Sequence, residues 1–72
     1  MKILHIMNRE KHTVHAVGLY DKYFLNGEHE ILFLNQKGQD SLIFPQFNIP
    51  QREVFLTNDL VSDIKLLKKS LM

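Results

Sequence analysis

The 72-residue sequence contains no cysteine, no tryptophan, only two prolines and only three glycines. The lack of cysteine excludes disulfide bridges, thiolate metal ligands and a catalytic thiol. Nine Lys and Arg against eight Asp and Glu give a formal charge of +1, without the basic excess of a dedicated nucleic-acid-binding domain. No apolar run approaches the roughly 18 residues that span a membrane, and the first apolar stretch is too short for a signal-peptide core. We therefore expect a cytoplasmic protein that binds no nucleic acid.

The composition is that of an ordinary globular domain, with 44% hydrophobic and 24% charged residues. We expect one small domain over residues 1–72. A domain of about 60 residues buries only ~60% of the surface of its unfolded chain. Without a disulfide, such a domain needs an unusually good core, self-association or additional chain. We expect the isolated chain to self-associate.

Apolar patterning predicts a β-α-β unit in the first half of the chain. The run at 2–7 is almost continuously apolar, which is typical of a strand covered on both faces in a parallel sheet. Residues 11–25 predict a helix with Gly18 on its polar side, ending before Gly27. Its expected apolar stripe is Ala16, Val17, Leu19, Tyr20, Tyr23 and Phe24. A second buried strand at 30–34 completes the pattern of a right-handed parallel crossover.

The second half predicts a further strand at 53–56 and a final helix with an apolar stripe of Leu60, Ile64, Leu67 and Leu71. Residues 41–44 are a candidate for an additional short strand, after which Pro45 and Pro50 forbid a central strand. The helix reaches the last residue without a stop signal, as in a sequence that continues. The fold class is therefore α/β, a partial Rossmann-like three-layer unit with a mostly parallel sheet and the order β-α-β-(β)-β-α.

The first strand-to-helix loop is the candidate ligand-binding site, because open α/β sheets bind ligands outside the carboxyl ends of their strands. This loop consists of Asn8, Arg9, Glu10, Lys11 and His12. Its side chains around a helix start suit a polar or anionic ligand. It contains no glycine, which excludes a dinucleotide fingerprint and a P-loop. A solvated charged loop without a ligand remains the alternative.

Histidines are the residues of this chain best suited to acid-base chemistry. His12 is the candidate base or substrate contact because it lies in that loop. His12 and His15 lack third and fourth ligands at a diagnostic spacing, so we expect no metal site. His5 lies within a strand and is expected to be a neutral core histidine with one hydrogen bond.

Two further groups have structural interpretations. We expect Glu28 and Glu30 to be solvated at the start of the second strand. Three phenylalanines, Phe44, Phe47 and Phe55, are candidates for a small aromatic cluster, with core packing as the default and an exposed patch as the alternative.

With these elements placed, the first half of the chain resembles a known family. The resemblance rests on the strand and loop from Lys2 to Lys11, the aromatic-rich helix ending at Tyr23-Phe24, and the segment from Glu28 to Leu34. It resembles the start of bacterial GT-B glycosyltransferases, and among them the 4-acetamido-4,6-dideoxygalactosyltransferase family of enterobacterial common antigen synthesis. Beyond residue 34 only the order of the elements agrees.

The resemblance implies that the chain is the first portion of the acceptor-side, N-terminal Rossmann-like domain of such an enzyme. The parent would transfer a sugar from a nucleotide-sugar to a lipid-linked or polysaccharide acceptor, at the inner face of the membrane in that family. The family's donor site lies chiefly in its C-terminal domain, so no donor-binding or catalytic residue is carried over, and neither a metal nor another cofactor is implied. The alternative is a self-contained α/β interaction module without catalysis, as a homodimer.

Overall fold

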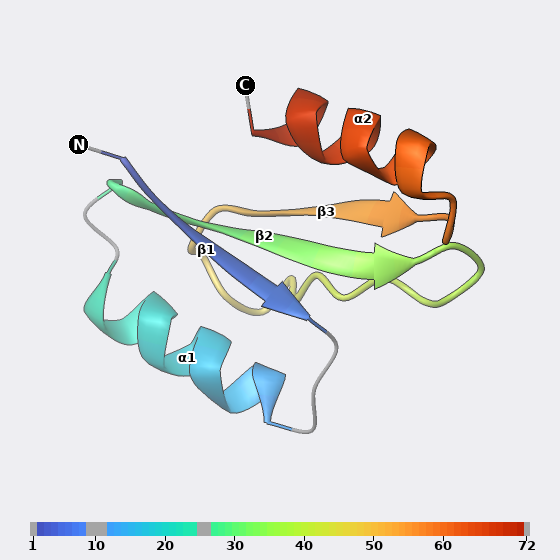
Figure 1. Cartoon of the computed structure of the whole chain (residues 1–72). Helices are drawn as coiled ribbons and strands as arrows, with labels where there is room; N and C mark the ends of the chain where they lie inside the picture. Colours follow the sequence, from blue (N-terminus) through green and yellow to red (C-terminus); the bar gives the residue numbers. More distant parts are fainter. Residues whose placement is uncertain (1, 9–11, 25–26, 72) are drawn as a thin grey trace.

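The computed structural model describes residues 2–8, 12–24 and 27–71. Its elements are β1 (Ile3–Asn8), α1 (Thr13–Tyr23), β2 (His29–Gln36), β3 (Gln51–Leu56) and α2 (Leu60–Ser70). The three strands form one parallel sheet in the order β1-β2-β3. Figure 1 shows α1 on one face of the sheet and α2 on the other. This arrangement confirms the predicted α/β class and the three-layer, Rossmann-like organisation.

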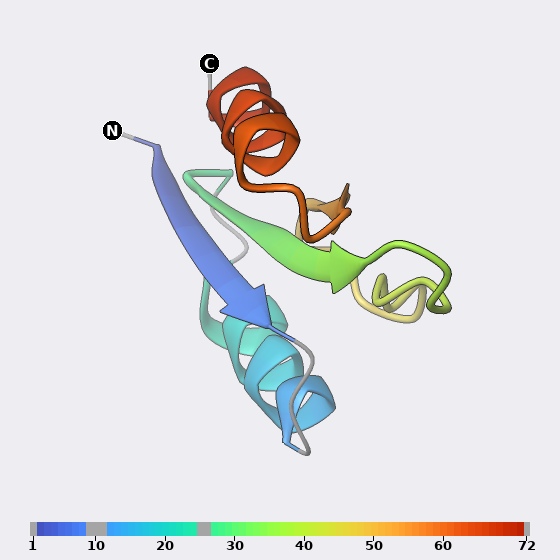
Figure 2. The same cartoon turned by 45° about the vertical axis from the view of Figure 1, so that its right-hand side comes forward.

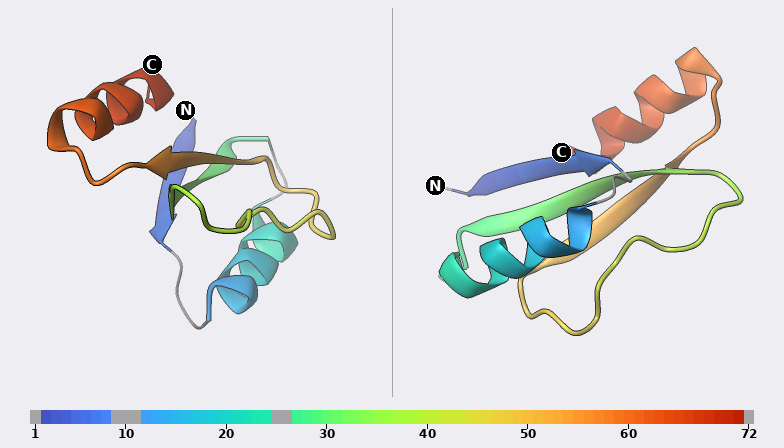
Figure 3. Two further views of the ribbon diagram at one scale, coloured as in Figure 1. Left: turned by 90° about the vertical axis from the view of Figure 1, so that its right-hand side faces the viewer. Right: turned by 90° about the horizontal axis from the view of Figure 1, so that it is seen from below.

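The candidate strand at 41–44 does not form. Residues 37–50, the connector, run irregularly from β2 to β3 on the same face of the sheet as α1 (Figure 3). Side chains of β3 take the place of a strand partner. The amide of Gln51 accepts from Phe44 N at 2.7 Å and donates to Phe44 O at 2.9 Å, and Glu53 accepts from Leu42 N at 2.8 Å. With these backbone groups satisfied, the connector needs no ladder.

The hydrophobic core lies between the sheet, α1 and the connector. Its buried members are Val17, Ile31, Phe33, Leu42 and Ile49, with Met7, Tyr20, Phe24, Phe44 and Phe47 packed against them. Phe44 forms edge contacts with Phe33 at 6.0 Å and with Phe47 at 6.2 Å between ring centroids. Phe55 was predicted for this cluster but is 38% exposed, because it lies near the end of the edge strand β3.

The buried face of α1 is rotated from the predicted stripe. Leu19 and Tyr23 are exposed, whereas Val17 is fully buried. A Cβ on Gly18 would lie 3.3 Å from Cζ of Phe47. The connector therefore reaches α1 at Gly18, which was predicted to lie on the polar side of the helix, whereas His15 and Lys22 on that side stay exposed. A helical wheel of α1 does not show where the connector packs.

The opposite face of the sheet is covered only in part. Leu32 and Val54 are buried there, and α2 packs on β3. Figure 2 shows α2 displaced from β1. Ile3 and Ile6 of β1 are 41% and 54% exposed, so the prediction that this strand is covered on both faces was wrong.

α2 has a sound amino-terminal cap but a largely exposed apolar face. Asp59 caps the helix by accepting from Val61 N at 3.3 Å, as its position predicts. In contrast, Leu60, Ile64 and Leu71 are more than half exposed, and only Leu67 of the predicted stripe is half-buried. Hydrophobic spacing along this helix therefore did not identify the side that meets the sheet.

Candidate functional site

Two shallow depressions lie side by side where β1 and β2 end. The first, of about 290 Å³, is lined by Ile6, Met7, Asn8, His12, Thr13 and Ala16. The second, of about 280 Å³, is lined by Asn8, Leu34, Asn35, Gln36 and Gln39. Asn8 is common to both. Because this is the carboxyl edge of a parallel sheet, the depressions occupy the place where open α/β proteins bind ligands.

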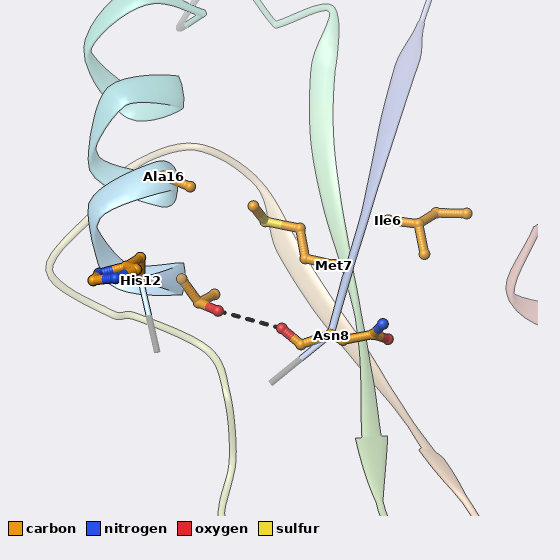
Figure 4. A pocket seen from close by; sticks show the side chains of 6 residues that line it. Ile6, Met7, Asn8, His12 and Ala16 are labelled. Atoms are coloured by element: carbon orange, nitrogen blue, oxygen red, sulfur yellow. Dashed lines mark hydrogen bonds between the residues drawn. The ribbon is translucent and has the colours of Figure 1, made fainter. Parts of the chain in front are cut away.

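The first depression is built by the junction between β1 and α1. Thr13 is buried, and its Oγ1 donates to Asn8 O at 3.3 Å, which fixes the start of the helix against the end of the strand (Figure 4). Met7 points toward Ala16, and Ile6 points to the other side of β1. Asn8 and His12 are exposed, and the His12 side chain makes no capping bond to α1. Their amide and imidazole are thus presented to solvent.

The structure describes the first and last residues of the predicted ligand-binding loop. Asn8 and His12 line the same depression. Arg9, Glu10 and Lys11 lie outside the residues that the structure describes.

The second depression contains residues that the sequence argument missed. Asn35 is 1% exposed; its Nδ2 donates to Asp40 O at 2.7 Å, and its Oδ1 accepts from Gln36 N at 2.8 Å. Asn35 therefore shapes the edge, whereas Gln36 and Gln39 are exposed and offer their amides. The polar run that directly follows the second predicted strand was a sequence signal that could have identified these residues.

A third depression, of about 270 Å³, lies toward the amino ends of the strands and is held together by charge. It is lined by Lys2, Leu4, Glu30, Arg52 and Leu71. Arg52 Nε donates to Glu30, and Lys2 Nζ lies 3.4 Å from Glu30 Oε2. The hydrogen bond from Arg52 is the main cause of a lowered pKa at Glu30. The prediction of a solvated Glu30 was wrong, because its carboxylate is only 15% exposed and binds Arg52 of β3 and Lys2, which directly precedes β1.

His5 hydrogen-bonds to His29 on the α1 face of the sheet. His5 Nε2 and His29 Nδ1 lie 2.8 Å apart, and the His5 ring stacks on Tyr20 at 4.5 Å. Burial, and secondarily the neighbouring His29, lower the pKa of His5 from its usual 6.5. The predicted hydrogen bond is confirmed, although His5 is half-buried and not a core residue.

The part of the chain that the structure describes contains neither a candidate metal centre nor a candidate membrane-spanning helix. Within it, no three His, Asp or Glu side chains are grouped to hold a metal ion. No helix there is both long and apolar enough to cross a bilayer.

The parallel sheet with a helix on each face defines this chain as an α/β protein with a Rossmann-like unit. Comparison with known proteins found no matching family model, no matching curated protein and no matching solved structure.

Proposed function

We propose that this chain is the acceptor-side portion of a GT-B-like glycosyltransferase and binds one ring of a sugar-containing ligand at the carboxyl edge of β1 and β2. The resemblance of residues 2–34 supplies the enzyme class. The observation that carries the binding proposal is the pair of depressions that meet at Asn8.

The lining of these depressions suits a hydroxyl-rich ring. Side-chain amides both donate and accept hydrogen bonds, as sugar hydroxyls do, and Asn8, Gln36 and Gln39 present them at this edge. Ala16 in the first depression and Leu34 in the second add apolar surface on which the C–H groups of a sugar ring can pack. Small-molecule sites usually measure roughly 300–1,000 Å³, so depressions of about 290 and 280 Å³ each fit one ring and not a whole nucleotide-sugar.

The same lining explains why the chain alone is proposed to be non-catalytic. Among the described residues that line the two depressions, His12 is the only titratable one. A base acts on a substrate that other groups position and activate. In the proposed enzyme, His12 contacts the acceptor or accepts its proton, and a second domain supplies the nucleotide-sugar.

Amide chemical shifts of the ¹⁵N-labelled chain test this proposal. Titration with a methyl glycoside is expected to shift the amides of Asn8, His12 and Gln36 and to leave those of Lys2 and Arg52 unchanged. Asn8→Ala should reduce the ligand-induced chemical-shift changes at least several-fold. Asn48→Ala, which replaces an exposed asparagine on the connector, should leave them unchanged. Shifts confined to the amino edge, or none at millimolar ligand, would refute the binding site.

A self-contained interaction module is the second candidate, favoured by one observation. Large apolar side chains are exposed on β1 and α2, including Ile6 at 54% and Val61 at 62%. Exposed apolar surface of this kind marks contact sites for other proteins.

A further inference from the structure

The outer edge of β1 carries unpaired backbone groups. Ile3 N donates to Glu28 O, so the peptide groups of Ile3, and of every second residue after it, face β2. The peptide groups of Leu4 and Ile6 therefore point away from the sheet. Within residues 2–8, 12–24 and 27–71, no strand pairs with that side of β1.

This edge lacks the features that normally keep sheet edges apart. Edge strands are usually protected by charged residues, proline or bulges. β3, the other edge, is preceded by Pro50 and contains Arg52 and Glu53. β1 has the sequence ILHIMN, with no charged residue, proline or glycine. The two edges of the sheet are therefore not equivalent, and within the described residues only that of β3 carries such protective residues.

Apolar side chains flank the unprotected edge on both faces of the sheet. Ile6 is 54% exposed on the α2 side, and Ile3 is 41% exposed on the α1 side. A strand added at this edge would bring side chains beside both, since cross-strand neighbours lie about 4.5–5.5 Å apart. One added strand would thus satisfy the outward peptide groups and cover both isoleucines.

We propose that β1 of a second copy of this chain supplies that strand, in antiparallel orientation, so that two three-stranded sheets join into one. Antiparallel pairing about a two-fold axis sets one uncharged strand against another and sends the two Lys2 side chains to opposite ends. Parallel pairing would bring those lysines together. Because the β3 edges stay protected by charge, assembly stops at the closed dimer. This inference does not rest on the proposed glycosyltransferase function.

Light scattering after gel filtration tests the dimer. The expected mass is twice the 8.5 kDa of the chain, falling toward 8.5 kDa on dilution. Ile6→Lys places a charge at the edge and is expected to give a monomer with an unchanged circular dichroism spectrum. Val61→Lys is the matched control, because Val61 is an apolar residue on α2 that is 62% exposed against 54% for Ile6, and this variant is expected to remain dimeric.

Hydrogen exchange of the unsubstituted chain tests the same pairing without relying on a variant that folds. The Leu4 and Ile6 amides should exchange several-fold more slowly as the protein concentration rises, whereas exposed amides of the connector should not change. A monomer at all concentrations, open-ended polymers, or a dimer broken by Val61→Lys but not by Ile6→Lys would overturn the proposal.

Discussion

At the scale of single residues, the contact between His5 and His29 links stability to pH. The two rings meet nitrogen to nitrogen at 2.8 Å, with their centroids 5.1 Å apart, and the His5 ring stacks on Tyr20 at 4.5 Å. One ring can donate and the other accept only while at least one of them is neutral. Protonation of both rings would replace the hydrogen bond by repulsion on a half-buried face.

The sign of the pH effect follows from the direction of the shift. The pKa of His5 is lowered in the folded chain, chiefly by burial, so below pH 6.5 the unfolded chain binds more protons than the folded one. The free energy of unfolding is therefore expected to fall as the pH drops from 7.5 through 6.5 toward the lowered pKa. Urea denaturation at several pH values measures this slope.

Replacement of one histidine isolates the effect. His5→Phe keeps an aromatic ring against Tyr20 and should flatten the slope between pH 7.5 and 5.5. His15→Phe, at an exposed histidine of α1, should leave the slope unchanged. Equal slopes in the parent chain and His5→Phe would show that the histidine contact does not cause the pH dependence of stability.

At the scale of elements, the connector is held in place by side chains. Glu53 accepts from Ser41 Oγ at 2.6 Å, from Leu42 N at 2.8 Å and from Asn35 Nδ2 at 3.3 Å. Asp21 of α1 accepts from the backbone nitrogens of Asn48 and Ile49 at 2.7 and 2.8 Å. Carboxylates thus hold both ends of a segment that has no regular structure.

Removal of the Glu53 carboxylate should loosen the connector. Hydrogen bonds to charged groups contribute roughly 1.5–3 kcal/mol each, and the Leu42 amide would lose its partner. We expect Glu53→Ala to lower the free energy of unfolding by about 2–3 kcal/mol in urea denaturation. Gln46→Ala, at an exposed connector residue, should change it by less than about 0.5 kcal/mol. Similar values for both variants would contradict the anchoring role.

At the scale of the whole molecule, the two faces of the sheet contribute unequally. The α1 face contains the fully buried cluster around Phe33, whereas α2 has no buried residue. Most of the hydrophobic stabilisation therefore comes from one of the two interlayer spaces.

Truncations on each face measure this asymmetry. Phe33→Ala should cost about 3–5 kcal/mol, a large part of the roughly 5–15 kcal/mol that stabilises a domain. Leu67→Ala, at a half-buried residue of α2, should cost about 1 kcal/mol, since little of its contact area is removed from water. Urea denaturation followed by circular dichroism gives both values. Equal losses would mean that the α2 face of the sheet contributes as much to stability as the α1 face.

Part of the candidate site could be predicted, because the order of strands and helices along the sequence shows which loops follow the strands. Asn8 and His12 follow from the rule that ligands bind where parallel strands end. Gln36 and Gln39 obey the same rule at the second strand and were missed because only the first loop was considered. The burial of Asn35 was beyond prediction, because Asp40 approaches it only when the connector folds back and Glu53 only when β3 pairs with β2.

The sequence by itself determined the order and type of the elements and the fold class. Apolar runs, the Asp59 cap and the turn glycines act over a few neighbouring residues, so the helices and strands that they define can be predicted from the sequence. Only the tertiary structure decided that β1 is an exposed edge, that the connector packs on α1 at Gly18 and that α2 presents Ile64 to solvent. The burial of a side chain depends on which segment, distant in the sequence, packs against it. In this protein the packing of the connector on α1 and the order of the strands in the sheet determine which side chains are buried.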